Sequence, residues 1–423
     1  MFQYLFTKTP LVFLVQPLWR DEAFSYLLAK KNIFQILVLS AKDFSPPLYY
    51  LILHFWMKIF GSSEIALRSL SFVFFWATLY IVYLFLFNIF KFSLKKSFFY
   101  LLFFLINQLL LYYAFEARMY LMFAFFATLS FYSLYKKDFK LYLLSTILGL
   151  YTHYFMILIL VSQYFVSKNK NQLRAFLIFV PWLFLVLFQK GIVVGSFWIK
   201  KFDYRLIINF IGQLYTGYEN TFIFFEKSIS WFSLVLIILF YAGYLIIKMK
   251  TRQFKLFKYL LIWSVGIPLL TVIVSFIKPI FLPRYLIFST VGLILLISYI
   301  IEHLPKISRW LIIFLLMITT LNYNKLQIEK RQKTDFRKAS HEVKALIKKN
   351  DSLYATSELD FFVLEYYFPD NKVYLLGKNY DEIPDYVGKI LIPKNQIIKS
   401  LPYYPRKAFV FNSDGSYQIQ ALY

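Results

Sequence analysis

The chain has 423 residues, of which 60% are hydrophobic and 22% aromatic, and it carries a formal net charge of +25. A soluble domain of this size would not be so apolar, so the composition predicts a polytopic membrane protein. The lack of cysteine excludes disulfides, thiolate metal sites and a cysteine nucleophile. The Lys and Arg residues lie at the ends of apolar segments, so the positive charge indicates membrane orientation rather than a nucleic-acid surface.

The segment before Asp21 contains no apolar run long enough to cross a bilayer. Met1–Leu18 has no small-residue cleavage site and is interrupted by Lys8 and two prolines, so it does not read as a secretory signal. The charge pattern described below nevertheless requires an outside N-terminus. We therefore expect that the chain lacks a first transmembrane helix, or that Phe2–Leu18 inserts as a tilted half-span.

An acidic pair, Asp21-Glu22, follows at the edge of this apolar chain, where charges are costly and usually functional. The next two segments, Glu22–Ser40 and Pro47–Phe60, are interrupted by lysines or too short to cross the bilayer. We expect both to lie along the membrane plane with their apolar sides down. They would frame Asp21 over the bilayer, within reach of a lipid head group.

Apolar runs beyond residue 63 predict about ten transmembrane helices. The expected spans are Glu64–Phe90, Ser97–Phe115, Met119–Tyr135, Lys140–Thr152, Tyr154–Ser167, Ala175–Gly195, Ile229–Ile247, Tyr259–Ile277, Tyr285–Ile301 and Trp310–Tyr323. The fourth and fifth are short and could be one long helix with His153 near its middle. Two separate helices are preferred, because only then do the charges of the connections alternate.

Basic residues distinguish the two sides of the expected bundle. One set of connections holds Lys91, Lys95, Lys96, Lys136, Lys137, Lys140, Lys168, Lys170, Arg174, Lys248, Lys250, Arg252, Lys255, Lys258, Lys306 and Arg309. The opposite short connections hold little more than Arg118, Lys278 and Arg284. Since positive charge marks the cytoplasmic face, we expect Asp21, His153 and the C-terminal segment outside.

The C-terminal part reads as a small α/β domain. Asp335–Lys349 has apolar residues at helical spacing. Strand-like runs follow at Ser352–Thr356, Lys372–Leu376, Lys389–Ile392, Ala408–Asn412 and Ser416–Gln420. The last two flank an Asp414-Gly415 turn, which predicts a hairpin. We therefore divide the chain into an extracytoplasmic catalytic loop with interfacial helices (1–63), a transmembrane domain (64–323) and an extracytoplasmic α/β domain (324–423).

Several short patterns occur in a recognisable order. They are W-R-D-E-A-F-S (Trp19–Ser25), S-P-P-L-Y-Y (Ser45–Tyr50), G-S-S-E-I-A-L-R-S-L-S (Gly61–Ser71), E-A-R-M-Y (Glu116–Tyr120), Y-T-H-Y-F (Tyr151–Phe155) and P-R-Y-L (Pro283–Leu286). Together they resemble the protein mannosyltransferase and aminoarabinose transferase group, which are polyprenyl-phosphate-sugar glycosyltransferases of the GT-C type. The resemblance covers nearly the whole membrane part and, in outline, the C-terminal domain.

The resemblance implies a GT-C fold and transfer of a sugar from a polyprenyl-phosphate donor to a hydroxyl of a protein, lipid or glycan acceptor. The aspartate of the D-E pair is the base in this family, so Asp21 would take the acceptor proton, in an inverting reaction. The plain alternative for Asp21 is a helix N-cap. Glu22 could pair with Arg68, touch the acceptor, or be a first-turn acid favoured by the helix dipole. No cofactor is required, although Glu22 and the phosphate could hold a divalent cation.

The departing phosphate needs cations. The candidates are Arg68, Arg118, Arg284, Lys278 and His153. Arginine forks onto phosphate in a bidentate manner. For Arg68 the plain alternative is an i,i+4 pair with Glu64. For Arg118 and Arg284 it is snorkelling at the interface, and for His153 it is a hydrogen-bonded helix end.

Two rival functions remain on the sequence alone. A transporter or flippase for a lipid-linked sugar would usually have glycine-broken helices and charges at mid-membrane. This chain has only 12 glycines, and its candidate charges lie at one face. An inactive family member acting as a scaffold is disfavoured by the intact Asp21-Glu22 pair and favoured by the missing first helix. The preferred prediction is a multi-pass glycosyltransferase of the cell membrane.

Overall fold

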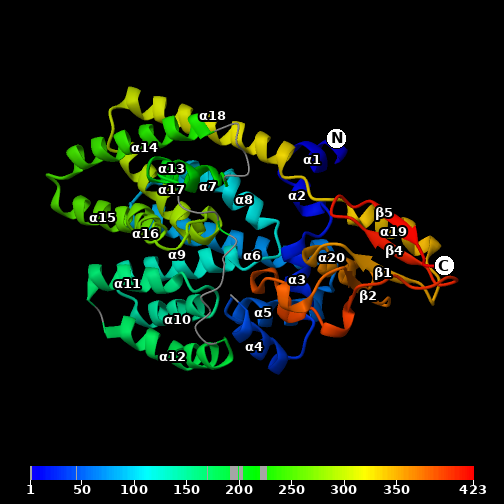
Figure 1. Cartoon of the computed structure of the whole chain (residues 1–423). Coiled ribbons are helices and arrows are strands. Elements are labelled where there is room, and N and C mark those ends of the chain that lie inside the picture. Colours follow the sequence, from blue (N-terminus) through cyan, green and yellow to red (C-terminus); the bar gives the residue numbers. More distant parts are fainter. Residues whose placement is uncertain (1, 44, 169, 191–198, 200–202, 220–225) are drawn as a thin grey trace.

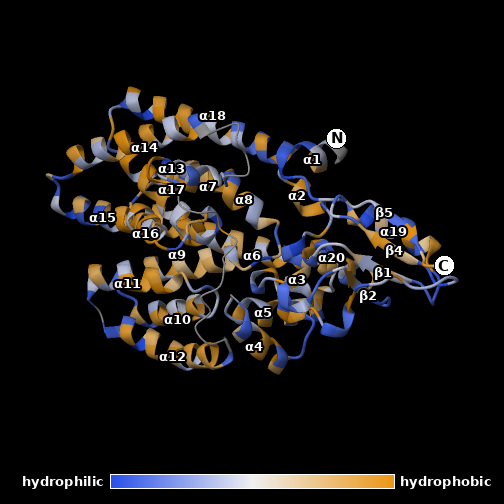
Figure 2. Cartoon of the chain, in the orientation of Figure 1, coloured by the Kyte–Doolittle hydropathy of each residue, from blue (hydrophilic) through white to orange (hydrophobic). Residues whose placement is uncertain are grey.

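The computed structural model describes residues 2–43, 45–168, 170–190, 199, 203–219 and 226–423. These residues form a helical bundle with a small sheet domain at one end (Figure 1). Apolar residues predominate along the helices of the bundle, and polar residues gather where the bundle meets the sheet domain (Figure 2). Polar side chains therefore lie between the two parts of the molecule, at the junction of the bundle and the sheet domain.

In the described part of the chain, five helices precede the first long span. They are α1 (Phe2–Lys8), α2 (Val12–Val15), α3 (Arg20–Ala29), α4 (Ile33–Lys42) and α5 (Leu48–Phe60). The segment Phe2–Leu18, considered as a half-span, does not form one continuous helix, because a turn at residues 9–11 separates α1 from α2. The interfacial segment Glu22–Ser40 is also divided, since Asn32 accepts a hydrogen bond from the Gln35 N–H at 2.8 Å and caps α4.

The membrane part follows in chain order. Its elements are α6 (Glu64–Leu84), the π-helical turn η1 (Phe85–Ile89), α7 (Leu94–Leu105), α8 (Gln108–Ala114), α9 (Tyr120–Lys136), α10 (Phe139–Leu150), α11 (Met156–Ser167), α12 (Lys170–Lys190), α13 (Arg205–Thr216), α14 (Glu226–Ile247), α15 (Thr251–Leu261), the π-helical turn η3 (Ile262–Gly266), α16 (Ile267–Val274), the 3-10 turn η4 (Pro283–Leu286), α17 (Ile287–Ile301) and α18 (Lys306–Lys330). The end of the span expected at Ala175–Gly195 falls outside the described residues.

Within the described ranges, six helices are long and apolar enough to cross a membrane, and the bent pair α7 and α8 raises the number to seven. The expectation of about ten spans exceeds this because α9, α10 and α11 have only 17, 12 and 12 residues. α10 and α11 are separate helices, as expected, and His153 lies in the break between them. Helix α13 was not expected; it is amphipathic and buries Asn209 and Gln213.

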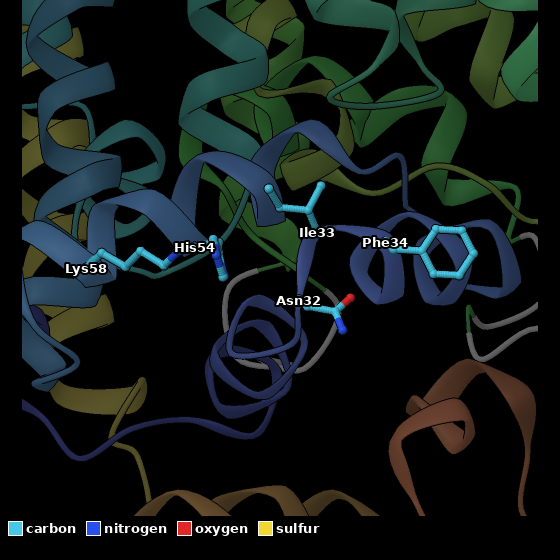
Figure 3. A pocket seen from close by; sticks show the side chains of 5 residues that line it. All are labelled: Asn32, Ile33, Phe34, His54 and Lys58. Carbon is cyan, nitrogen blue, oxygen red and sulfur yellow. The ribbon is translucent and has the colours of Figure 1, made fainter.

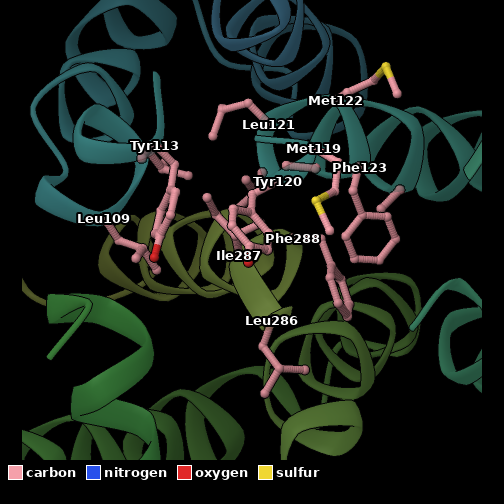
Figure 4. Close-up of a cluster of buried hydrophobic side chains, with 14 of the residues drawn as sticks. Leu109, Tyr113, Met119, Tyr120, Leu121, Met122, Phe123, Leu286, Ile287 and Phe288 are labelled. Atoms are coloured by element: carbon pink, nitrogen blue, oxygen red, sulfur yellow. The ribbon is translucent and has the colours of Figure 1, made fainter. Parts of the chain in front are cut away.

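Asn107 explains the 70° bend between α7 and α8. Its side chain accepts hydrogen bonds from the N–H groups of Leu109 and Leu110 at 3.1 and 3.2 Å and donates to the Tyr215 carbonyl at 2.9 Å. The backbone donors at the start of α8 are thereby satisfied inside the bundle. The bend brings Tyr113 of α8 into the buried cluster formed with Tyr120 of α9 and Phe288 of α17 (Figure 4).

The basic connections lie at the end of the bundle away from the sheet domain. Figure 1 shows the C-terminal end of α11 and the α14–α15 and α17–α18 connections at the left, opposite the sheet domain at the right. Lys96 and Arg309 approach the same carboxylate, Glu302, at 2.8 and 3.3 Å, so the α6–α7 and α17–α18 connections are neighbours. The side-to-side charge asymmetry of the sequence is therefore a property of the folded bundle.

The C-terminal domain contains a five-stranded sheet of order β3-β2-β1-β4-β5. Its elements are α19 (Phe336–Leu346), β1 (Ser352–Ala355), α20 (Glu358–Tyr367), β2 (Val373–Leu376), η5 (Tyr380–Glu382), η6 (Asp385–Val387), η7 (Lys389–Leu391), η8 (Lys394–Gln396), β3 (Ile397–Ile398), β4 (Ala408–Phe411) and β5 (Tyr417–Gln420). β4 and β5 form the expected antiparallel hairpin, whereas β1 pairs with β2 and β4 in parallel.

The strand expected at Lys389–Ile392 is wrong, because this segment forms the 3-10 turn η7. Gly388 precedes it in the left-handed region (φ +86°) and Pro393 follows it, and neither residue favours a continuous strand. Helix α20 was not expected. It packs against α3 and thus places the sheet domain against the N-terminal helices (Figure 1).

Candidate active site

Glu22 lies at the centre of a buried ion-pair network. Its side chain is 0% exposed, and its Oε2 accepts from the Trp19 N–H, Arg68 Nη2 and Lys333 Nζ, each at 2.8 Å. Its Oε1 accepts from Arg68 Nε at 2.8 Å and from the Ala117 N–H at 3.0 Å. Burial raises the pKa of Glu22, but Arg68 and Lys333 outweigh this effect and hold that pKa well below its ordinary value. Glu22 is therefore a fixed anion.

Arg68 uses every donor it has. A guanidinium carries five N–H groups, and besides those bound to Glu22 the remaining ones reach the carbonyls of Leu14, Gln16 and Pro17 at 2.6 to 2.9 Å. Its side chain is 0% exposed. This geometry corrects the sequence-based expectation: Arg68 has no donor left for a phosphate in this arrangement. The i,i+4 alternative is also wrong, because Glu64 pairs with Arg337.

Asp21 differs from Glu22 in its exposure and in the partners of its carboxylate. It is the second residue of α3 and partly exposed, while Trp19 is the N-cap, so the capping alternative for Asp21 is wrong. Across the described residues, no hydrogen bond or ion pair engages its carboxylate. Its backbone carbonyl accepts a hydrogen bond from Arg118 Nη1 at 3.2 Å, and the same Nη1 donates to Ser25 Oγ at 3.2 Å. The Arg118 guanidinium thus contacts the backbone of Asp21 and is close enough for the Asp21 carboxylate to attract it.

Polar atoms without protein partners surround this pair. Those with no hydrogen-bond partner among the described residues include Arg118 Nε, Glu116 Oε2 and the hydroxyls of Tyr49 and Tyr50. Such buried atoms are rare in folded proteins and need a partner such as water or a ligand. Burial opposes the charge of Arg118, but Tyr120 and Asp21 raise its pKa, so it stays cationic. The arrangement can accept an anion and a hydroxyl-rich ligand together.

Glu116 and Lys333 are site residues that the sequence did not single out. Burial raises the pKa of Glu116, and the negative charges of Glu22 and Asp21 add to that effect while Lys333 opposes it. Glu116 is 5% exposed. The E-A-R-M-Y pattern contains Glu116 and could have marked it. Lys333 stands in a polar run after the last span, where nothing in the sequence distinguishes it from its neighbours.

Arg284 lies in η4, at the start of α17, with its guanidinium 6.0 Å from the centre of the Tyr285 ring. Its Nη1 is 3.7 Å from Glu219 Oε2, and its side chain is 18% exposed. The Tyr113 hydroxyl approaches the other Glu219 oxygen at 3.4 Å. Arg331 stacks over the ring of Tyr112 at 4.3 Å. Arg284 is therefore partly exposed at the same end of the bundle as Arg118. Its partner, the Glu219 carboxylate, also interacts with the Tyr113 hydroxyl.

His153 and Lys278 are placed differently. His153 is 7% exposed, its ring stacks on Phe123 at 4.8 Å, and its Nδ1 accepts from the Phe155 N–H at 3.2 Å. Burial, assisted by Arg118, lowers the pKa of His153 to about 3. Lys278 is exposed, and no contact of its ammonium with another described residue is found. The structure thus places His153 beside the cluster in its neutral form and does not connect Lys278 with it.

The metal role considered for Glu22 has no geometric support, because both of its oxygens are taken by N–H donors. No group of three or more His, Asp or Glu ligands occurs in the part of the chain that the structure describes. A separate open cavity of about 490 Å³ lies between α4 and α5 and is lined by Asn32, Ile33, Phe34, His54 and Lys58 (Figure 3). None of the expected site residues lines this cavity.

The helical bundle, the short N-terminal helices packed over one end and the small sheet domain define a polytopic membrane protein of the GT-C fold. Among solved structures, ArnT from Cupriavidus metallidurans in the apo state is similar, with a TM-score of 0.61 and 12% identity over 95% of this chain and 90% of that chain. The structure of that ArnT bound to undecaprenyl phosphate gives a TM-score of 0.58 and 12% identity over 97% of this chain and 92% of that one. No family model and no curated protein matches the sequence.

Proposed function

We propose that this chain is an integral membrane glycosyltransferase that moves a sugar from a polyprenyl-phosphate donor to an acceptor hydroxyl. One observation carries the proposal: Asp21, whose carboxylate has no hydrogen bond or ion pair with a described residue, lies beside Arg118 and a set of buried polar atoms without hydrogen-bond partners in the described part of the chain. The likeness to ArnT, one structure of which holds undecaprenyl phosphate, supports the donor class. The acceptor is a protein, a lipid or a glycan.

The reaction follows from these groups. Asp21 accepts the proton of the acceptor hydroxyl while the acceptor oxygen forms its bond to the anomeric carbon. The bond between that carbon and the phosphate oxygen breaks, and polyprenyl phosphate leaves with the electron pair. A phosphate leaves without protonation, so a single carboxylate suffices. Because the acceptor attacks in one displacement, opposite the leaving phosphate, the anomeric configuration inverts.

The cations divide into two roles. We assign the phosphate to Arg118 and Arg284, both of which are partly exposed. Glu22 and Arg68 hold α3 against α6, which positions Asp21 instead of touching the substrate. His153 packs against Phe123, and we assign no donor contact to His153 or Lys278. The reaction as written needs no metal.

We further propose that the site and the sheet domain face outside the cell membrane. The basic connections lie at the opposite end of the bundle, and positive charge marks the cytoplasmic side (Figure 1). In this division, residues 1–63 carry the base, 64–323 form the transmembrane domain, and 324–423 form the extracytoplasmic domain. An outside site fits a donor whose lipid chain stays in the bilayer while its sugar is presented to an extracytoplasmic acceptor.

The test is sugar transfer from radiolabelled polyprenyl-phosphate monosaccharides into host membranes, with and without a chelator. Asp21→Asn keeps the size of the side chain and removes the base, so we expect transfer to fall by about 10²- to 10⁴-fold. Asp370→Asn, at an exposed position, is the matched control and should transfer as the wild type does. Full transfer by Asp21→Asn would contradict the assignment of the base. Absence of transfer from every donor would contradict the function and favour a transporter or a scaffold.

A further inference from the structure

Lys333 is buried to an unusual degree for a lysine. It lies between α18 and α19, its side chain is 3% exposed, and its ammonium donates to Glu22 Oε2 at 2.8 Å. Lysine is almost never fully buried unless it is paired, because removing its charge from water is costly. Burial lowers the pKa of Lys333 and the attraction of Glu22 offsets part of that shift. The ion pair with Glu22 therefore compensates for the cost of burying the Lys333 ammonium.

The contact joins distant parts of the chain at one carboxylate. Glu22 follows Asp21 directly on α3, and its oxygens also hold Arg68 of α6 and the N–H of Ala117. Lys333 adds the segment that leads into the sheet domain. A displacement of this segment would therefore shift Glu22 and, because both residues belong to α3, would also shift Asp21.

Other contacts of the sheet domain reach the same stretch of chain. Arg20 forms two hydrogen bonds to Asp360 of α20, at 2.6 and 3.0 Å. The Leu18 N–H donates to the Tyr367 hydroxyl at 2.9 Å. Phe24 meets Phe362 edge to face at 5.6 Å. Asp21 is thus flanked on both sides by residues that the sheet domain holds, while its own carboxylate stays unengaged.

We propose that Lys333 is a positioning residue through which docking of the sheet domain fixes the catalytic carboxylate of Asp21. This inference rests on the proposed function of Asp21. Lys333 touches neither the sugar nor the phosphate; it holds Glu22, and Glu22 sets the start of α3. A displacement of about 1 Å at a reacting group can cost roughly 10²-fold in rate, so the loss of one such anchor affects the chemical step.

The first test compares Lys333→Met with Lys338→Met, an exposed lysine of α19. We expect Lys333→Met to lower kcat by about 10- to 100-fold with the donor KM changed less than about twofold, because Arg118 and Arg284 are untouched. Lys338→Met should match the wild type. An unchanged kcat, or a loss that appears only in KM, would overturn the proposal.

A second test separates charge from packing. The chain contains no cysteine, so Lys333→Cys provides a single thiol that can receive an aminoethyl or a propyl group through a methanethiosulfonate reagent. The two adducts have similar length, but only the first carries an ammonium. We expect the aminoethyl adduct to recover kcat and the propyl adduct to remain as slow as Lys333→Met. Equal recovery with both adducts would show that Lys333 only fills space.

Hydrogen exchange of the α3 amides provides a readout that does not depend on activity. Exchange in α3 should be faster in Lys333→Met than in Lys338→Met, and equal exchange would overturn the positioning role. If the wild type transfers no sugar from any donor, the proposed function fails. The exchange result still decides whether Lys333 fixes α3, so the two failures are distinguishable.

Discussion

Replacing Glu22 by glutamine tests the buried network most directly. The amide keeps one acceptor oxygen, which can still serve Arg68 Nε and the Ala117 N–H. The other position becomes an NH₂ group, which cannot accept from the Trp19 N–H, Arg68 Nη2 or Lys333 Nζ. Two buried cations then lose the anion that compensates them, and three donors lose an acceptor.

The expected cost follows from the burial of this network. Removing one partner of a buried ion pair destabilises a protein by about 3–5 kcal/mol, because the remaining charge is left uncompensated. Both Glu22 and Arg68 are 0% exposed, so solvent screening does not reduce this figure. The loss is a large part of a typical folding free energy of about 5–15 kcal/mol. We therefore expect Glu22→Gln to destabilise the chain by about 3–5 kcal/mol.

The assay is reversible unfolding in mixed micelles, with Glu342→Gln as the control at an exposed position of α19. The pKa of Glu22 is lowered in the folded chain, so its stabilisation is complete above the ordinary value of 4.5 and is lost as the pH falls below it. Glu22→Gln should remove that part of the acid sensitivity. A destabilisation of less than about 1 kcal/mol, as expected for a surface change, would refute the network as a source of stability.

Two further predictions concern His153 and Gly388. The folded chain lowers the pKa of His153 from 6.5 to about 3, so stability should fall by about 1.4 kcal/mol per pH unit below 6.5 as the unfolded chain takes up a proton. His153→Gln should remove this slope in unfolding measured at pH 5 and 7.5, and an unchanged slope would contradict burial of the neutral ring. A Cβ on Gly388 would lie 2.6 Å from the Phe24 ring at a φ of +86°, so Gly388→Ala should cost about 2–4 kcal/mol. In unfolding experiments the double variant with Phe24→Ala should cost less than the sum of the two changes, and strict additivity would contradict the contact.

Much of the fold was readable because apolar length and turn chemistry are local signals. Hydropathy alone predicts the spans that correspond to α6, α14, α17 and α18. The Asp414-Gly415 turn correctly predicts the β4–β5 hairpin. The shortness of α10 and α11 was also visible. Helix α13 was missed because its apolar residues are interrupted by polar ones that are buried only in the folded bundle.

The site was only partly predictable. The order of short motifs drew attention to Asp21 and Arg118, and the structure places them next to each other. The hydrogen-bond partners of Arg68 could not be predicted from the sequence. Apart from Glu22 they are backbone carbonyls of the segment before α3, which only tertiary folding brings to Arg68. Lys333 was invisible for the same reason, since a buried lysine and an exposed one have the same sequence context.

The spacing of the Glu22 network along the chain implies an order of assembly. Arg68 is 46 positions from Glu22, whereas Lys333 is 311 positions away. During synthesis the N-terminal parts of a chain become available first, so the Glu22–Arg68 pair can enter the membrane region early as a neutral unit. Lys333 is made only after α18, the last candidate span among the described residues. Until Lys333 is made, Glu22 can pair with Arg68 but lacks its second cation.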